Sequence, residues 1–192
     1  MRAGAQPLQV HAATGLLVGV RQVLSPHRDP RPAGVAPDLI VLHGISLPPG
    51  EYGGPFIEQL FTGNLPTGAH PYFETIAGLR VSAHLLIRRD GELLQFVPFG
   101  ERAWHAGRSS WDGREGCNDF SIGIELEGAD EAPYADAQYA CLAQLLDALY
   151  AGYPLLSPAR VVGHSDIAPG RKTDPGAAFD WSRLSIDRGQ HD

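Results

Sequence analysis

The chain has 192 residues, of which 43% are hydrophobic and 19% charged, and its formal net charge is −7. This length suits one globular domain with a core of its own. An acidic chain without a long basic run lacks the clustered Lys and Arg that bind nucleic acid or an anionic membrane surface. No run of residues approaches the about 20 apolar positions of a membrane span. Neither nucleic acid nor a membrane is therefore an expected partner.

The first 24 residues are interpreted as an N-terminal extension. Within it, Ala12 to Val20 is largely apolar, but Arg21 follows at once and no small-residue cleavage site is present, so the segment does not match a secretory signal peptide. The two cysteines, Cys117 and Cys141, match no zinc or redox motif and do not form a disulfide framework. These features predict a cytoplasmic protein.

Residues 25–37 carry four prolines and predict an extended lead-in. Asp38 to His43 is an apolar run that ends on a histidine, which is typical of a buried central strand. Residues 46–78 are rich in Gly and Pro and contain one short stretch, Phe56 to Phe61, that predicts a turn or two of helix. A long irregular insertion of this kind is often functional, for instance as a lid.

Residues 81–88 and 92–97 flank an Asp-Gly pair, which predicts a β-hairpin. Residues 121–127 alternate strictly: Ile122, Ile124 and Leu126 share one face of a strand, and Gly123, Glu125 and Glu127 share the other.

Three further elements follow along the chain. Apolar residues recur at helical spacing from Ala135 to Tyr150, which predicts a helix. Residues 160–164 predict a short strand that again ends on a histidine, and residues 179–184 predict a last short helix. Strands and helices therefore mix, and we expect a single α/β domain with a mixed central sheet flanked by helices.

Two histidines, His43 and His164, stand at the ends of apolar strand-like runs, where sites gather in α/β sheets. Asp174 follows His164 by ten residues in a proline-rich loop. Two imidazoles and one carboxylate form a normal ligand set for catalytic zinc, which keeps a fourth position for water. This spacing alone is a weak signal, because ligands on separate loops have no fixed pattern.

The other histidines are read as non-catalytic. His84 lies inside a predicted strand and is interpreted as a hydrogen-bonded structural residue. His70 is expected to face solvent in the insertion, and His11, His27 and His191 are expected to be inert in tails or lead-ins.

Hydrolysis of an amide also requires a base and a group that stabilises the oxyanion. Glu125 and Glu127 both lie on the polar face of their strand, so either could be the base, and either could simply face solvent. Lys172, two residues before Asp174, is placed to supply a cation, although composition alone favours a solvated loop lysine.

Seven collinear segments resemble the zinc-dependent N-acetylmuramoyl-L-alanine amidases related to AmpD and to T7-type phage lysozyme. The similarity is close to the 1,6-anhydro-N-acetylmuramyl-L-alanine amidase branch and runs from Ser25 to about Trp181. It indicates an amidase domain over residues 25–185 and a C-terminal tail over 186–192. The segments are ISLPPGEYGGPFI, LFTGNL, HPYF, LRVSAHLLIRRDGELLQFVPF, RAWHAGRSSW, CNDFSIGIELEG and HSDIAPGRKTDPG.

The resemblance implies a peptidoglycan-recognition-protein-like fold and a role for each matching residue. It implies that zinc is bound by His43, His164 and Asp174, that Glu125 rather than Glu127 is the catalytic acid/base, and that Lys172 stabilises the oxyanion. It also implies a substrate groove, with an anhydromuropeptide as the substrate, and a monomeric enzyme of cytoplasmic peptidoglycan recycling. The residues implied on or near this groove are Tyr72, Arg80, Trp104, His105 and Arg171.

The sequence departs from the family pattern at two positions. Gly44 follows the first ligand where close relatives usually have Asn, so one side-chain donor near the sugar or metal is lost. Ala83 stands where phage-type relatives have a catalytic Tyr, which places more weight on Glu125. Two alternatives stay open: a module that binds peptidoglycan without cleaving it, and an exported amidase that acts on the intact wall.

Overall fold

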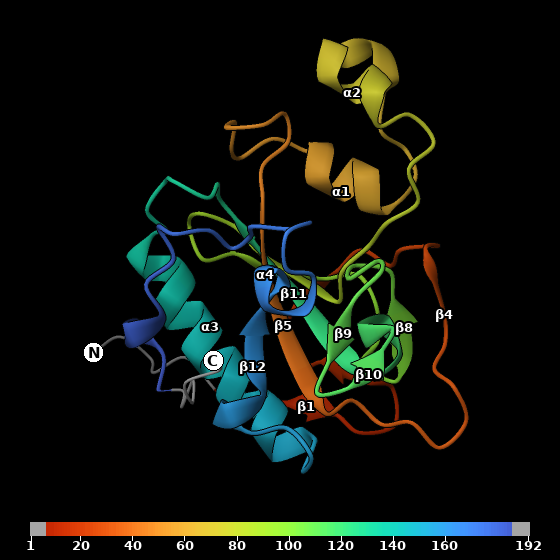
Figure 1. Cartoon of the computed structure of the whole chain (residues 1–192), viewed down its shortest axis with the longest axis vertical. Helices are drawn as coiled ribbons and strands as arrows, with labels where there is room; N and C mark the ends of the chain where they lie inside the picture. The colour runs from red at the N-terminus through yellow and green to blue at the C-terminus, as the bar shows by residue number, and fades with distance from the viewer. Residues whose placement is uncertain (1–6, 186–192) are drawn as a thin grey trace.

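The computed structural model of the protein describes residues 7–185, so the tail over 186–192, His191 and the first six residues of the extension lie outside the described residues. Its centre is a six-stranded sheet with the order β12–β5–β11–β6–β7–β3. Strands β12, β5 and β11 lie side by side in Figure 1. Strands β12, β5, β11 and β6 run parallel, and β7 runs antiparallel to β6. The expected mixed sheet flanked by helices is confirmed.

The bounds of the elements follow the predicted order. The strands of the central sheet are β3 (Arg21–Gln22), β5 (Leu39–Ile45), β6 (Leu85–Ile87), β7 (Leu93–Gln95), β11 (Ser121–Glu127) and β12 (Val161–Gly163). The paired short strands are β1 (Val10–His11) with β2 (Leu16–Leu17), β4 (Arg28–Pro30) with β8 (Glu101–Ala103), and β9 (Ser110–Trp111) with β10 (Arg114–Glu115). The α-helices are α1 (Phe56–Phe61), α2 (Pro71–Thr75), α3 (Asp136–Gly152) and α4 (His164–Ile167). The 3₁₀ turns are η1 (Thr67–Ala69), η2 (Cys117–Asp119), η3 (Pro158–Arg160) and η4 (Trp181–Arg183).

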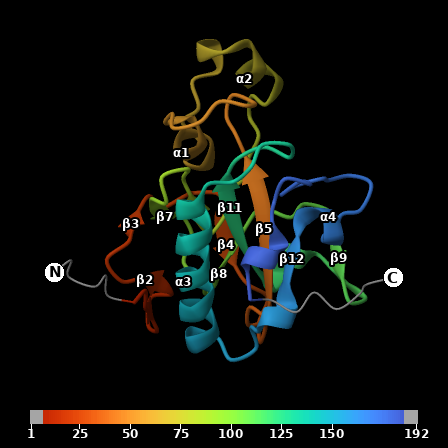
Figure 2. The same cartoon turned by 90° about the vertical axis from the view of Figure 1, so that its left-hand side faces the viewer.

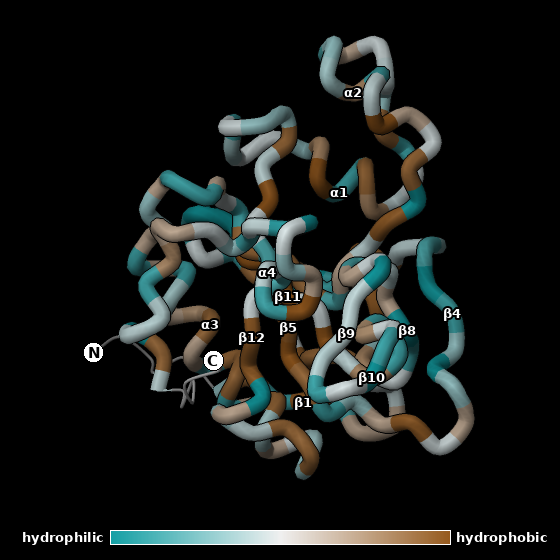
Figure 3. The backbone as a smooth tube through the Cα atoms, in the orientation of Figure 1, coloured by the Kyte–Doolittle hydropathy of each residue, from teal (hydrophilic) through white to brown (hydrophobic). Residues whose placement is uncertain are grey.

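Helix α3 covers one face of the sheet (Figure 2). Its apolar side packs against Ile40 and Leu42 of β5 and against alternate residues of β11 in one buried cluster. Because side chains alternate along a strand, Val41 and His43 of β5 point to the opposite face. Figure 3 shows the hydrophobic segments concentrated along these central strands. The face away from α3 is therefore where the strand-end histidine lies.

Strand β11 is buried along its whole length, because both faces of the sheet are covered. The predicted alternation is correct: Ile122, Ile124 and Leu126 join the cluster under α3. The alternative that the two glutamates face solvent is wrong, since Glu125 is 9% exposed and Glu127 is 1% exposed. A buried carboxylate needs partners or a function, so each glutamate requires an explanation.

The insertion over residues 46–78 lies beyond one end of the sheet (Figure 1). The helix predicted over residues 56–61 is confirmed as α1, which buries Ile57, Leu60 and Phe61. Helix α2 and the turn η1 were not predicted, because Pro and Gly on either side mask so short a helix. Phe73 of α2 is fully buried and anchors this second helix.

The short helix predicted over residues 179–184 is present as the 3₁₀-helix η4 over Trp181–Arg183. The described part of the N-terminal extension packs onto the domain, since β3 pairs with β7 and Leu17 is 1% exposed in the core. Within residues 7–185, no helix is both long enough and apolar enough to cross a membrane.

Candidate active site

The ends of three neighbouring parallel strands bring the candidate site together. Strands β5 and β11 pair in register, so Glu125 lies directly beside His43 and points to the same face. Strand β12 lies on the other side of β5 and ends at Gly163, so that His164 begins helix α4 at the same edge of the sheet. Loops and sites gather at the carboxyl ends of parallel strands for this reason.

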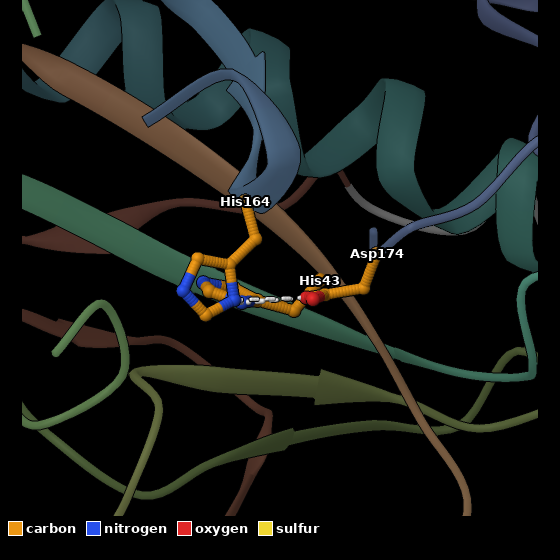
Figure 4. Close-up of side chains that lie close together, drawn as sticks. All are labelled: His43, His164 and Asp174. Atoms are coloured by element: carbon orange, nitrogen blue, oxygen red, sulfur yellow. Dashed lines mark hydrogen bonds and ion pairs between the residues drawn. The ribbon is translucent and has the colours of Figure 1, made fainter. Parts of the chain in front are cut away.

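Three side chains converge there (Figure 4). The Nδ1 atoms of His43 and His164 are 2.9 Å apart, and Oδ2 of Asp174 lies 3.1 Å from the first and 3.0 Å from the second. Within residues 7–185, these side chains form a cluster whose ligand atoms could hold one metal ion. Tetrahedral zinc with bonds of about 2.0–2.1 Å separates its ligand atoms by roughly 3.3 Å. The triangle therefore needs to open by only a few tenths of an ångström to fit zinc.

The electrostatics of the cluster suit a cation. Burial, helped by the neighbouring His164, lowers the pKa of His43 to about 4, although Asp174 opposes that shift. Burial disfavours the charged form of Asp174, but the two histidines outweigh it and hold the pKa of that carboxyl well below its usual range. A neutral imidazole and an ionised carboxylate are the forms that bind a metal.

Glu125 is in the state expected of a general base or acid. Burial, and then the charge of Asp174, raise the pKa of Glu125 well above its ordinary value, while Lys172 opposes that shift. Its Oε2 atom is buried and has no hydrogen-bond partner among the described residues. An orphaned carboxylate oxygen beside a metal-ligand cluster is suited to accept a hydrogen bond from a water or a substrate.

Glu127 is held by structural partners instead. Its Oε1 accepts a hydrogen bond from the backbone N of Gly53 at 2.6 Å, and its Oε2 accepts one from the backbone N of Arg89 at 3.1 Å. An ion pair of 3.5 Å with Arg88 completes its surroundings. Glu127 therefore ties the start of the insertion to the β-hairpin, which explains why this second glutamate is buried.

The cluster of His43, His164 and Asp174 opens into a cavity of about 420 Å³. Glu125 and the exposed Lys172 line it together with the three clustered side chains. The insertion supplies one wall, mostly from apolar residues. The lining residues from the insertion are Ser46, Leu47, Pro49, Leu60, Phe61, Tyr72 and Ile76.

The five residues expected to contact substrate line three different cavities. Tyr72, Trp104 and His105 line the 420 Å³ cavity. Arg80 lines a separate hollow of about 220 Å³ behind the insertion. Arg171 lines a larger cavity of about 920 Å³ that includes none of the three clustered side chains, and it donates hydrogen bonds to the backbone O of Ala106 and of Arg108.

Gly44 is flanked by a tyrosine. A Cβ added at Gly44 would lie 2.3 Å from the hydroxyl of Tyr134, which donates a hydrogen bond to the backbone O of Pro175. The space beside the first histidine is therefore filled by a side chain from a distant segment. Sequence reasoning identified the missing donor at position 44 but not Tyr134, because no local pattern links these positions.

The remaining histidines follow the predictions only in part. His84 is fully buried and structural as expected: its Nδ1 accepts a hydrogen bond from the backbone N of Gly123, and its Nε2 lies 3.1 Å from the backbone O of Glu101. His27 was expected to be inert in a lead-in, but it is 8% exposed and its ring bonds the backbone O of Val81. His27 is packed against the domain because the next residues, strand β4, pair with β8.

Comparisons with known proteins identify the family of this chain. The family model described as N-acetylmuramoyl-L-alanine amidase matches residues 33–177. The 1,6-anhydro-N-acetylmuramyl-L-alanine amidase AmpD of Escherichia coli strain K12 is 61% identical over 172 residues, which cover 90% of this chain and 93% of that protein.

Solved structures give the same result. A crystal structure of a Se-Met AmpD derivative matches with a TM-score of 0.87 and 60% identity, and the match covers 89% of this chain and 95% of that one. The amidase AmiD from E. coli, solved with the substrate anhydro-N-acetylmuramic acid-L-Ala-D-gamma-Glu-L-Lys, matches with a TM-score of 0.56 and 31% identity, over 80% of this chain and 59% of that one. The chain therefore belongs to the N-acetylmuramoyl-L-alanine amidase family, in its AmpD-type branch.

Proposed function

We propose that this enzyme uses zinc to hydrolyse the amide bond between 1,6-anhydro-N-acetylmuramic acid and L-alanine, in cytoplasmic recycling of cell-wall fragments. The observation that carries the proposal is the convergence of His43, His164 and Asp174 within 2.9–3.1 Å beside the orphaned oxygen of Glu125. The identity to the AmpD amidases and the substrate in the AmiD structure support the choice of substrate.

The ion would be held by Nδ1 of His43, Nδ1 of His164 and Oδ2 of Asp174, which lie within 2.9–3.1 Å of one another. When bound, zinc supplies a Lewis acid for the scissile carbonyl and lowers the pKa of a coordinated water. These three side chains come from two strand ends and one loop, and they line the same cavity as Glu125 and Lys172.

Glu125 takes the proton of the attacking water and returns it to the leaving alanine nitrogen. Its burial suits both steps, because a carboxyl with a raised pKa accepts a proton more readily than an exposed one does and is still protonated when the leaving nitrogen needs that proton. Lys172, on the rim of the same cavity, stabilises the negative charge that develops on the carbonyl oxygen.

The cavity wall that the insertion provides would contact the sugar or the stem peptide. Tyr72 and Trp104, which are both aromatic, line this cavity. Arg80 and Arg171 stay predicted contacts for the carboxylates of a stem peptide, since a guanidinium binds a carboxylate with two parallel hydrogen bonds. The two free cysteines, Cys117 and Cys141, are compatible with the proposed cytoplasmic setting.

One experiment tests the reaction and the substrate together. The purified protein is incubated with an anhydromuropeptide and, separately, with intact sacculi, each with and without a chelator, and the products are identified by mass. We expect free stem peptide from the small fragment only, and none after chelation. Equal release from sacculi would overturn the recycling role, and full activity in chelator would overturn zinc dependence.

A further inference from the structure

His105 lies directly behind the first proposed metal ligand. His43 directs Nδ1 toward His164 and Asp174, and its other nitrogen, Nε2, lies 2.9 Å from Nδ1 of His105. Nε2 of His105 lies 3.1 Å from Oγ of Ser121, and that hydroxyl lies 2.5 Å from the backbone O of Cys117. A chain of hydrogen bonds therefore runs from the proposed ligand to a backbone carbonyl.

The direction of each bond in this chain follows from the last one. A carbonyl oxygen only accepts, so the single hydroxyl proton of Ser121 is donated to Cys117, and Oγ must accept from Nε2 of His105. The ring partners of His105 are His43 and Ser121, neither of which is an acid. A neutral His105 with its proton on Nε2 accepts at Nδ1, so His43 must donate from Nε2. Nδ1 of His43 then directs its lone pair toward Nδ1 of His164 and Oδ2 of Asp174, which is the position that a metal would take.

The second histidine reaches a carbonyl in one step. Nε2 of His164 lies 3.2 Å from the backbone O of Ala106, so a proton on Nε2 has an acceptor there and Nδ1 can face the proposed metal position beside Asp174. The adjacent residues His105 and Ala106 therefore contact both proposed ligands. The side chain of His105 contacts His43, and the backbone O of Ala106 contacts His164. Oδ1 of Asn118 accepts hydrogen bonds from both backbone N–H groups, at 3.1 Å and 2.8 Å, and holds the pair in place.

The ring of His105 also requires a glycine beside it. A Cβ added at Gly123 would lie 2.4 Å from the ring of His105, with Oγ of Ser121 two residues earlier on the same face of β11. Strand β11 therefore supplies Glu125 to the cavity and Ser121 to the chain of hydrogen bonds, called the relay below. Gly123, which has no side chain, leaves room for His105 to contact both His43 and Ser121.

We propose that His105 and Ser121 are positioning residues that hold His43 in the Nε2-protonated tautomer, so that its Nδ1 is ready to bind the metal. This inference rests on the proposed function, in which His43 is a zinc ligand. It also gives His105 a role other than the substrate contact that the family resemblance implies. Hydrogen-bond partners behind a metal ligand commonly change metal affinity by about 10- to 100-fold.

The first test needs no mutation. The tautomer of His43 is read from the ¹⁵N chemical shifts of its ring in metal-free protein at neutral pH. We expect a protonated, pyrrole-type Nε2 and a bare, pyridine-type Nδ1. A dominant Nδ1-protonated form would overturn the proposal, whether or not the protein binds zinc.

The second test removes the end of the relay. Ser121→Ala leaves Nε2 of His105 without its acceptor, so we expect mixed tautomers of His43 and zinc affinity lower by about 10- to 100-fold in competition with a fluorescent chelator. Ser25→Ala is the matched control, because it removes another buried hydroxyl that donates to a backbone carbonyl, that of Phe61. Natural zinc affinity and an unchanged tautomer in Ser121→Ala would contradict the proposal.

A third comparison covers the case in which Ser121→Ala does not fold. His105→Gln keeps an acceptor for His43 and a donor for Ser121, whereas His105→Leu fills space without either. We expect zinc to bind more tightly to the Gln variant than to the Leu variant. Equal losses would mean that the ring acts by packing alone. If the natural chain itself binds no zinc, the proposed function fails, while the tautomer of His43 still decides the relay.

Discussion

The strand ends that hold the proposed catalytic residues and the insertion that forms one wall of the cavity are stabilised in different ways. Strands β5 and β11 pair over seven residues in the middle of the sheet, and every residue of β11 is buried. The insertion has helices of only six and five residues, held by a few apolar side chains and by one hydrogen bond from the backbone N of Gly53 to Glu127. Short helices with few buried contacts open more easily than central strands. Changes at the strand ends should therefore alter turnover or metal binding, and changes in the insertion should alter substrate binding.

Glu125→Gln should have the largest effect. It keeps the size of the side chain but removes the general acid/base, so we expect kcat to fall by roughly 10²- to 10⁴-fold while zinc content stays the same. Turnover of an anhydromuropeptide and metal analysis of the same sample measure both. Glu115→Gln, on the exposed strand β10, is the control. Near-natural turnover in Glu125→Gln would remove Glu125 from the mechanism.

Lys172→Ala should have the second-largest effect on kcat. The loss of one group that stabilises an oxyanion costs roughly 10²- to 10³-fold in kcat. Lys172→Arg keeps the positive charge and should recover part of that loss, which separates the effect of charge from that of shape. If Ala and Arg variants turn over equally fast, the charge at this position does not take part in the reaction.

Phe73→Ala tests the insertion. Removal of a fully buried phenylalanine costs about 3–5 kcal/mol in a well-packed core, and here we expect the loss to fall on helix α2. KM should rise roughly tenfold, which corresponds to about 1.4 kcal/mol, while zinc affinity stays unchanged. Glu74→Ala, exposed on the same helix, is the control. A loss of zinc in Phe73→Ala would show that the two regions are not independent.

The pH dependence of stability gives the smallest effect. The pKa of Glu125 is raised in the folded chain above its ordinary value of 4.5, so the folded state holds this proton more tightly than the unfolded state does. As the pH rises above 4.5, the natural metal-free chain should lose stability relative to Glu125→Gln, by at most about 1.4 kcal/mol per pH unit. Urea unfolding in chelator measures this difference, and parallel curves for the two chains would contradict it.

Local patterns predicted the elements well where periodicity was strong. The apolar run that ends on His43 predicted the buried strand β5, and the alternation of residues 121–127 predicted the two faces of β11. Helical spacing predicted α3 within two residues at its C-terminal end. Alternation could not show that both faces of β11 are covered, because burial depends on distant segments. The same limit explains why the burial of His27 was not predicted, since it depends on the pairing of β4 with the distant strand β8.

The types of residue in the candidate site could be predicted from the sequence. The way in which separate segments bring them together, and the hydrogen-bond partners of each, could not. The convergence of His43, His164 and Asp174 needed the family resemblance, because three separate segments supply the side chains. Residue spacing did not separate Glu125 from Glu127. The structure separates them by their partners, since backbone N–H groups and Arg88 satisfy Glu127, while an oxygen of Glu125 is unpaired.

The register between β5 and β11 limits how this gene can change in length. Glu125 pairs directly with His43, and side chains alternate between faces at every residue. Deletion or addition of one codon within either strand would turn its functional side chain toward α3, because a one-residue slip inverts the two faces. Codons can be gained or lost at far lower cost in the irregular parts of the insertion. In a library of single-codon deletions, we therefore expect survivors between α1 and α2 and almost none within these two strands.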